Sequence, residues 1–224
     1  MKIKGITRIE YFTKGKRGIL YTGFYKHKKV VIKAKLPESM AEGRIENEGR
    51  WLKILNKYKI GPKLIKSTKD YFFYEYVPGE FFIDFVEKLD RNKESKKKIL
   101  DIIKDVLEQC FVLDQLKVDK EEMHHPIKHI IITKKLKPIM IDAGKSKISS
   151  IQKTPDVVLL DFERCHNVEN GKNVTQFSVF LIRLKELLLE YGIKIEQDKM
   201  IELLKIYKRE QTKNNFNKII NKIA

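Results

Sequence analysis

The most restrictive feature of this sequence is a single change of pattern near Pro78-Gly79. Before it, short runs rich in β-branched and aromatic residues are typical of strands. Three such runs are 18–25, 29–33 and 71–77. After it, apolar residues recur at helical spacing, most clearly over 99–110 and 174–191. Strands followed by helices predict an α+β fold with two lobes and a cleft between them.

We place the lobe boundary at the Pro-Gly pair, with a strand-rich N-lobe over residues 1–79 and a mostly helical C-lobe over residues 80–224. The sequence has no run of about 18 uncharged apolar residues, so no transmembrane helix is expected. The segment 1–5 lacks the apolar stretch of a secretory signal, and we therefore expect a cytoplasmic protein. Cys110 and Cys165 are too few for a disulfide framework or a four-thiolate zinc site.

The charge is strongly positive, with 47 Lys and Arg against 30 Asp and Glu, a formal net charge of +17. Such a surface attracts polyanions, which points to RNA or a ribonucleoprotein as a partner rather than to a membrane. The lysines are spread along the whole chain, however, as compositional drift or heat adaptation would also produce. Charge alone leaves both interpretations open.

Two segments of the predicted N-lobe offer backbone groups to a nucleotide. Gly15 and Gly18 lie in a turn before a strand, where backbone N–H groups can approach phosphates closely. The aromatic strand near residue 75 leads into Glu75 and Val77, an extended segment between the lobes whose N–H and C=O groups could read the edge of an adenine. Each pattern alone is equally typical of an ordinary hairpin turn or core strand.

A lysine in an apolar strand is the first candidate catalytic residue. Lys33 follows the run 30–32, and a buried charge of this kind is costly unless it is paired. The helix predicted over residues 38–58 carries Glu46 and Glu48, either of which could pair with Lys33 and hold it in place for phosphate binding.

At this point the order of motifs resembles the N-lobe of a protein kinase: glycine turn, lysine strand, helix with glutamate, and extended hinge. It is most similar to the small atypical kinases, including RIO-type enzymes and the archaeal kinase of the tRNA-threonylcarbamoylation complex. The segments 124–132, 161–165 and 173–177 resemble an archaeal family of predicted serine/threonine kinases. The resemblance implies that Lys33 pairs with the ATP phosphates, that Glu48 (with Glu46 as second choice) pairs with Lys33, and that Asp161 binds the metal ion.

The resemblance also shows two departures in the catalytic loop. Kinases place the catalytic Asp five residues before a metal-binding Asn. If His129 occupies the Asn position, the Asp position falls on His124, and neither expected residue is present. His124 could act as the general base. His129 at a metal position predicts weaker Mg²⁺ binding and a preference for Mn²⁺, because imidazole suits softer divalent ions.

The metal-binding Asp has two candidates. Asp161 follows the strong strand run 157–160 and begins Asp-Phe-Glu, similar to the motif of choline- and aminoglycoside-type kinases. Asp142 lies closer to His129 along the chain. We favour Asp161, in which case residues 143–155 form an inserted loop.

A zinc site is the alternative use of the histidine cluster, with His125 and His129 four residues apart and Cys165 supplying sulfur. Pro126 opposes it, because proline disfavours the continuous helix that would present both imidazoles on one face.

The sequence therefore predicts an atypical ATP-dependent protein kinase acting on Ser or Thr, with ATP and Mg²⁺ or Mn²⁺ as cofactors, and Lys33, Glu48, His124 and Asp161 as catalytic residues. The protein substrate is not specified. The alternative is a catalytically inactive kinase-fold module that binds nucleotide or docks on RNA or a ribonucleoprotein. The missing Asp and Asn favour the alternative, whereas the retained Lys33, Glu48 and Asp161 favour the enzyme.

Overall fold

The computed structural model describes residues 2–15, 18–36, 43–141 and 148–223, and residues 134–156 by their backbone alone. Its N-terminal part is a five-stranded antiparallel sheet in the order β1-β2-β3-β5-β4. The strands are β1 (Ile6–Lys14), β2 (Gly18–Tyr25), β3 (Lys28–Lys35), β4 (Leu64–Ser67) and β5 (Tyr71–Glu75). Strand β1 lies at an edge and is almost entirely exposed, which explains why it has no apolar alternation in the sequence.

Helix α1 (Arg44–Leu55) lies across this sheet and continues into the 3₁₀ turn η1 (Asn56–Tyr58). Its buried face carries Trp51, Leu52 and Leu55, which join the main hydrophobic core. Gly49 allows the close approach of this helix to β4, because a Cβ at that position would overlap the Ser67 side chain. The apolar residues that form this face therefore also set the position of Glu48, which lies between them.

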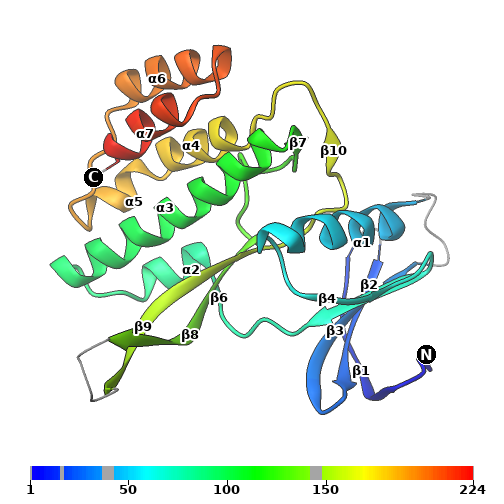
Figure 1. Cartoon of the computed structure of the whole chain (residues 1–224). Coiled ribbons are helices and arrows are strands. Elements are labelled where there is room, and N and C mark those ends of the chain that lie inside the picture. Colours follow the sequence, from blue (N-terminus) through cyan, green and yellow to red (C-terminus); the bar gives the residue numbers. More distant parts are fainter. Residues whose placement is uncertain (1, 16–17, 37–42, 142–147, 224) are drawn as a thin grey trace.

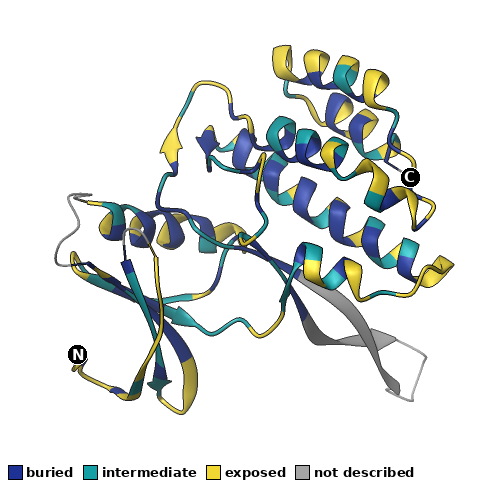
Figure 2. Ribbon diagram, turned by 180° about the vertical axis from the view of Figure 1, so that it is seen from behind, coloured by how far each residue is buried: buried dark blue, intermediate teal, exposed yellow. Residues whose placement is uncertain are grey.

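The C-terminal part is mostly helical (Figure 1). Its helices are α2 (Phe82–Glu87), α3 (Lys93–Gln115), α4 (Asn173–Arg183), α5 (Lys185–Leu189), α6 (Gln197–Arg209) and α7 (Lys213–Asn221). The single helix predicted over 174–191 is divided at Leu184, whose backbone leaves helical geometry between α4 and α5. Figure 2 shows the buried side of α3 and α4 facing the interior of this part. One continuous core runs from α1 to α7 and so joins the two parts of the molecule.

Two small sheets position the loops between the two parts. In the first, β6 (Glu80–Phe81) pairs with the long hairpin of β8 (Ile130–Ile141) and β9 (Ile148–Leu159). In the second, β7 (Val118–Asp119) pairs with β10 (His166–Asn167). The inserted loop predicted over 143–155 is wrong for its second half, because residues 148–155 belong to β9. Residues 142–147 lie outside the described residues, and with them the alternative metal residue Asp142.

The predicted fold class is confirmed: a strand-rich N-terminal part precedes a helical C-terminal part. Strand β5 ends at Glu75 and β6 begins at Glu80, and the extended segment between them is the connection that Figure 1 shows between the parts. Gly79 in this connection has no room for a side chain, because a Cβ there would overlap the carbonyl oxygen of Ile132. None of the helices in the described ranges is both long and apolar enough to cross a membrane.

Candidate active site

Lys33 is the centre of the site. Its Nζ lies 2.6 Å from Glu48 Oε2, 3.3 Å from Glu163 Oε2 and 3.7 Å from Asp161 Oδ1. Strand β3 supplies the lysine, α1 supplies Glu48, and the turn after β9 supplies the other two carboxylates. The structure thus brings together the three residues named from the sequence, Lys33, Glu48 and Asp161, and adds Glu163, which the sequence reasoning missed.

Charge, more than exposure to water, controls the ionisation of Lys33. Burial lowers the pKa of its ammonium group, but Glu48, Asp161 and Glu163 raise it by more, so the pKa lies above its ordinary value. Burial raises the pKa of Glu48, and Lys33 acts in the opposite direction. Three carboxylates therefore hold one permanently charged ammonium group in a fixed position.

Asp161 connects Lys33 to the catalytic loop. Its Oδ1 faces Lys33, whereas its Oδ2 lies 3.6 Å from Nε2 of His129. The backbone of Asp161 has a φ of 63°, a left-handed conformation that Asp tolerates better than most residues. Burial alone would raise the pKa of this carboxyl, yet Lys33, Lys120 and His129 together lower it below its usual value. Asp161 is therefore ionised at neutral pH.

Helix α1 is tied directly to the turn that carries Asp161. Asn47 donates from Nδ2 to the carbonyl oxygens of Glu163, at 2.9 Å, and of Cys165, at 3.1 Å. The N–H of Phe162 donates to Glu48 Oε1 at 3.3 Å. These bonds fix the position of Glu48 relative to Asp161 independently of the ion pair with Lys33.

Glu122, rather than His124, is the catalytic-loop residue that lies close to Asp161. A ligand oxygen of Glu122, an imidazole nitrogen of His129 and a carboxylate oxygen of Asp161 all lie within 4.8 Å of one another. Seven residues separate Glu122 from His129, so the five-residue spacing that pointed to His124 does not apply here. The exposed His124 lines the neighbouring pocket, and its carbonyl oxygen accepts a hydrogen bond from Arg183.

The set of Glu122, His129 and Asp161 fits a divalent cation. Burial and the charge of Lys120 lower the pKa of His129, so its imidazole is neutral at neutral pH and offers a lone pair. Asp161 Oδ1 is buried and has no hydrogen-bond partner among the described residues. Two carboxylates with one imidazole suit Mn²⁺ and later divalent ions better than Mg²⁺, which prefers oxygen ligands alone.

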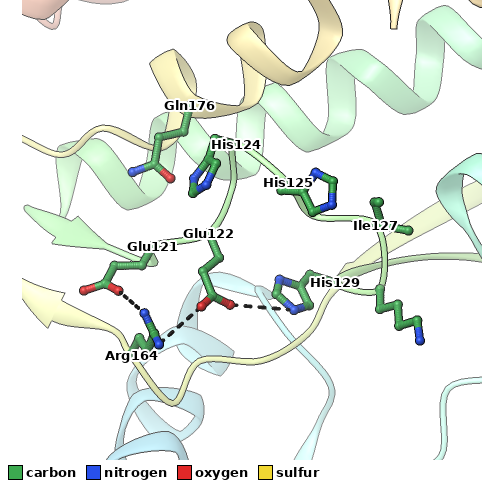
Figure 3. Close-up of a pocket in the computed structure, with 9 residues that line it drawn as sticks. Glu121, Glu122, His124, His125, Ile127, His129, Arg164 and Gln176 are labelled. Atoms are coloured by element: carbon green, nitrogen blue, oxygen red, sulfur yellow. Dashed lines mark hydrogen bonds and ion pairs between the residues drawn. The ribbon is translucent and has the colours of Figure 1, made fainter. Parts of the chain in front are cut away.

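A pocket of about 730 Å³ opens beside Glu122 and His129. Figure 3 shows these residues, which come from the catalytic loop, α4 and the turn after Asp161. The lining consists of Glu121, Glu122, His124, His125, Ile127, Lys128, His129, Arg164 and Gln176. Arg164 pairs with both glutamates of the loop, at 3.3 Å to Glu121 and 3.2 Å to Glu122, and so holds the loop against the turn. A pocket of this size next to the ion-pair cluster can receive a polar substrate group.

The proposed nucleotide-binding backbone lies in the N-terminal part. Gly15 and Gly18 close a turn between β1 and β2, with the N–H of Gly15 donating to the Gly18 carbonyl at 2.9 Å. The side chain of Glu75 is bound by Lys28 and Lys63 at the surface, and its N–H donates to the Lys63 carbonyl. Only the backbone beyond Glu75, at the half-buried Val77, is therefore suited to contact a base.

Two further sequence alternatives are not assembled. Glu46 is exposed near the start of α1 and lines a separate small pocket, so Glu48 is the partner of Lys33. His125 and Cys165 belong to neither cluster of metal-ligating side chains found among the described residues, which argues against the zinc site. Cys165 is buried, and burial raises the pKa of its thiol to about 12, so it is not a thiolate ligand.

A buried polar network supports the catalytic loop from below. Asp114 on α3 accepts hydrogen bonds from the N–H and Nδ2 of Asn173, from the N–H of Val174 and from the hydroxyl of Tyr207, at 2.8–3.2 Å. Asn173 in turn donates to the carbonyl of Val118, and its Oδ1 accepts from the N–H of Lys120. Burial raises the pKa of Asp114 to about 6, against these hydrogen bonds. The network fixes the chain where it enters the loop that carries Glu122.

No family model and no curated protein sequence matches this chain. The structure is nevertheless similar to two crystal structures of the Rio2 kinase from Chaetomium thermophilum. One, a complex with ADP/Mg²⁺ and phosphoaspartate, is 12% identical, with a TM-score of 0.54, over 82% of this chain and 55% of the Rio2 chain. The other is 11% identical, with a TM-score of 0.56, over 87% of this chain and 60% of the Rio2 chain.

A further solved kinase domain is 13% identical, with a TM-score of 0.51, over 84% of this chain and 64% of that domain. This chain therefore matches less than two thirds of the length of each of these proteins. At such low identity the likeness concerns the fold. The chain has an atypical protein-kinase-like fold, with the Lys33 cluster between its two parts.

Proposed function

We propose that this protein is an ATP-dependent phosphotransferase that transfers the γ-phosphoryl group of ATP to a Ser or Thr hydroxyl of a protein. The observation that supports this proposal is the contact of Lys33 with Glu48 and Asp161, three charged residues from separate segments, in a kinase-like fold. A structural scaffold gains nothing from burying these charges together, because buried ion pairs contribute little net stability.

The residues of the N-terminal part would hold the nucleotide. Lys33, kept in position by Glu48, binds the α- and β-phosphates. The backbone between Gly15 and Gly18 covers the phosphates, and the backbone of Glu75 and Val77 contacts the adenine. Phosphoryl transfer depends mainly on such positioning and on charge neutralisation.

Asp161 and His129 would hold the divalent cation, Mg²⁺ or Mn²⁺. The ion, when bound, supplies positive charge to the transferred phosphoryl group. The ionised state of Asp161 and the neutral state of His129 prepare both side chains for this role. The nitrogen ligand favours Mn²⁺.

Glu122 would serve as the general base. Its carboxylate faces the pocket beside His129, where an acceptor hydroxyl can enter (Figure 3). The hydroxyl gives its proton to Glu122 while its oxygen attacks the γ-phosphorus, and the bond to the β-phosphate oxygen breaks to release ADP. His124, on the same pocket, is the second candidate for this role.

The direct test is ADP formation from ATP with Mg²⁺ or Mn²⁺, with a generic acidic or basic protein as acceptor. Lys33→Met and Asp161→Asn should each lower turnover by at least about 100-fold, the cost of losing one preorganised charged group. Lys35→Met is the matched control, because Lys35 is an exposed lysine of the same strand, and it should keep the wild-type rate. Equal turnover in all four proteins would refute the proposal.

A non-catalytic nucleotide-binding module is the second candidate, and one observation favours it. Lys33 already has three carboxylate partners within 4.0 Å, so ATP phosphates must compete with Glu163 for its ammonium group. This candidate predicts stabilisation by ATP without any ADP formation. An RNA or ribonucleoprotein partner, inferred from the net charge of +17, is compatible with both and predicts binding that weakens steeply with salt.

A further inference from the structure

Lys120 is a buried cation for which the proposed chemistry has no role. It follows β7 at the entry to the catalytic loop, and only 2% of its surface is exposed. Its Nζ is fully buried and has no hydrogen-bond partner among the described residues. The ammonium group lies 5.3 Å from the centre of the Phe162 ring, the residue next to Asp161.

A buried, unpaired ammonium group is among the most costly groups to place in a protein interior. The contact with one phenyl ring offsets only part of that cost. Packing alone does not require the charge either, since an apolar chain of the same length would fill the space without it. The location of Lys120 therefore needs an explanation that uses its charge.

The surroundings of Lys120 supply one. The neighbouring carboxylates Glu48, Asp161 and Glu163 cluster within 4.8 Å of one another around the single ammonium of Lys33, which leaves an excess of negative charge. Lys120 reaches this charge from the opposite side of Phe162, and its field lowers the pKa of both Asp161 and His129. It thus acts on both residues that would hold the divalent ion.

We propose that Lys120 is an internal counter-ion of the metal site: its fixed charge weakens divalent binding to the free protein, so that the ion binds mainly together with the phosphates of the nucleotide. This inference rests on the proposed function, because it assumes that Asp161 and His129 hold the ion. Lys120 is a positioning residue in this scheme, since its buried ammonium acts through Asp161 and touches neither the nucleotide nor the acceptor.

The test is direct titration of the full chain with Mn²⁺ in the absence of nucleotide, with free Mn²⁺ followed by electron paramagnetic resonance. Lys120→Met removes the charge and keeps the length of the side chain, and we expect it to bind Mn²⁺ at least about tenfold more tightly than the wild type. Lys120→Arg keeps the charge and should retain the wild-type affinity. Lys128→Met removes a charge that lines the same pocket from an exposed position, where water screens it, and should change the affinity by less than about threefold.

A merely structural role for Lys120 predicts the opposite sign, because a loosened site would bind Mn²⁺ more weakly. Unchanged or weaker binding by a folded Lys120→Met protein therefore overturns the inference, as does absence of binding in every variant. If Lys120→Met does not fold, Lys120→Gln replaces it with the same expected direction. ADP formation by the wild type is measured separately, so failure of the counter-ion inference is distinguishable from failure of the proposed function.

Discussion

The Nζ of Lys33 and the Oε2 of Glu48 lie 2.6 Å apart, and both side chains are largely buried, at 15% and 5% exposure. This contact joins the middle strand of the sheet to the helix that lies across it. Removal of one partner from a buried ion pair leaves the other charge uncompensated, which is far more costly than the pair itself is worth.

We therefore predict that Lys33→Met lowers the free energy of unfolding by about 3–5 kcal/mol. Chemical denaturation measures the change. The exposed pair of Lys28 and Glu75 is the matched control, and Lys28→Met should cost about 1 kcal/mol or less. The double variant Lys33→Met/Glu48→Leu should recover most of the lost stability, and a double variant less stable than Lys33→Met would contradict this account.

The identity of the general base gives a second prediction. Glu122→Gln keeps the size of the side chain but removes the proton acceptor, and we expect turnover to fall by about 10²–10⁴-fold. His124→Ala, on the same pocket, should change turnover by less than about tenfold. Steady-state ADP formation distinguishes them, and the reverse order of effects would assign the role to His124.

The nitrogen ligand gives a third prediction, on metal preference. Replacing His129 by Asn exchanges an imidazole for an oxygen donor and should raise the rate with Mg²⁺ relative to that with Mn²⁺ by about tenfold or more. The measurement is the ratio of initial rates with each ion at saturation. An unchanged ratio would show that His129 does not contact the ion.

Asp114 provides a pH-dependent prediction. Burial raises its pKa in the folded protein to about 6, above the ordinary value of 3.8, so the folded state binds a proton more readily than the unfolded state between these values. Ionisation of Asp114 thus opposes folding above pH 6, and this penalty disappears as the pH falls towards 4. Wild-type stability should rise relative to that of Asp114→Asn by up to about 3 kcal/mol between pH 7 and pH 4.

Urea denaturation of both proteins at several pH values checks this. The difference between wild type and variant is the quantity of interest, because other carboxylates titrate equally in both. A difference that stays constant from pH 7 to pH 4 would mean that the hydrogen bonds to Asp114 outweigh its burial.

The sequence was informative where local pattern and tertiary structure agree. Lys33 stands in an apolar strand and Glu48 on the apolar face of a helix, so each is visible as a charge in a buried place, and the structure indeed brings them together. Strand β1 and the division of the helical segment at Leu184 were missed, because an exposed edge strand lacks alternation and a single backbone change leaves no mark on apolar spacing.

The catalytic loop shows why spacing failed. Counting five residues back from His129 assumes a loop of fixed length, whereas the chain uses seven residues to reach Glu122. A usable signal was present: the pairing of β7 with β10 fixes the start of the loop, and the two glutamates follow it directly. Glu163 and Lys120 could not have been found in this way, because their roles depend on contacts with residues far away in the sequence.

The hydrogen bonds of Asn47 and Glu48 to the segment of residues 161–165 have a consequence for control of the protein. They hold α1 at the turn that carries Asp161, so an outward swing of this helix would break every one of them together with the Lys33 ion pair. Switching by helix displacement is therefore costly here. A regulator of this protein should act as a plug over the open pocket or as a competitor for the nucleotide, leaving the charged cluster intact in both the active and the silenced protein.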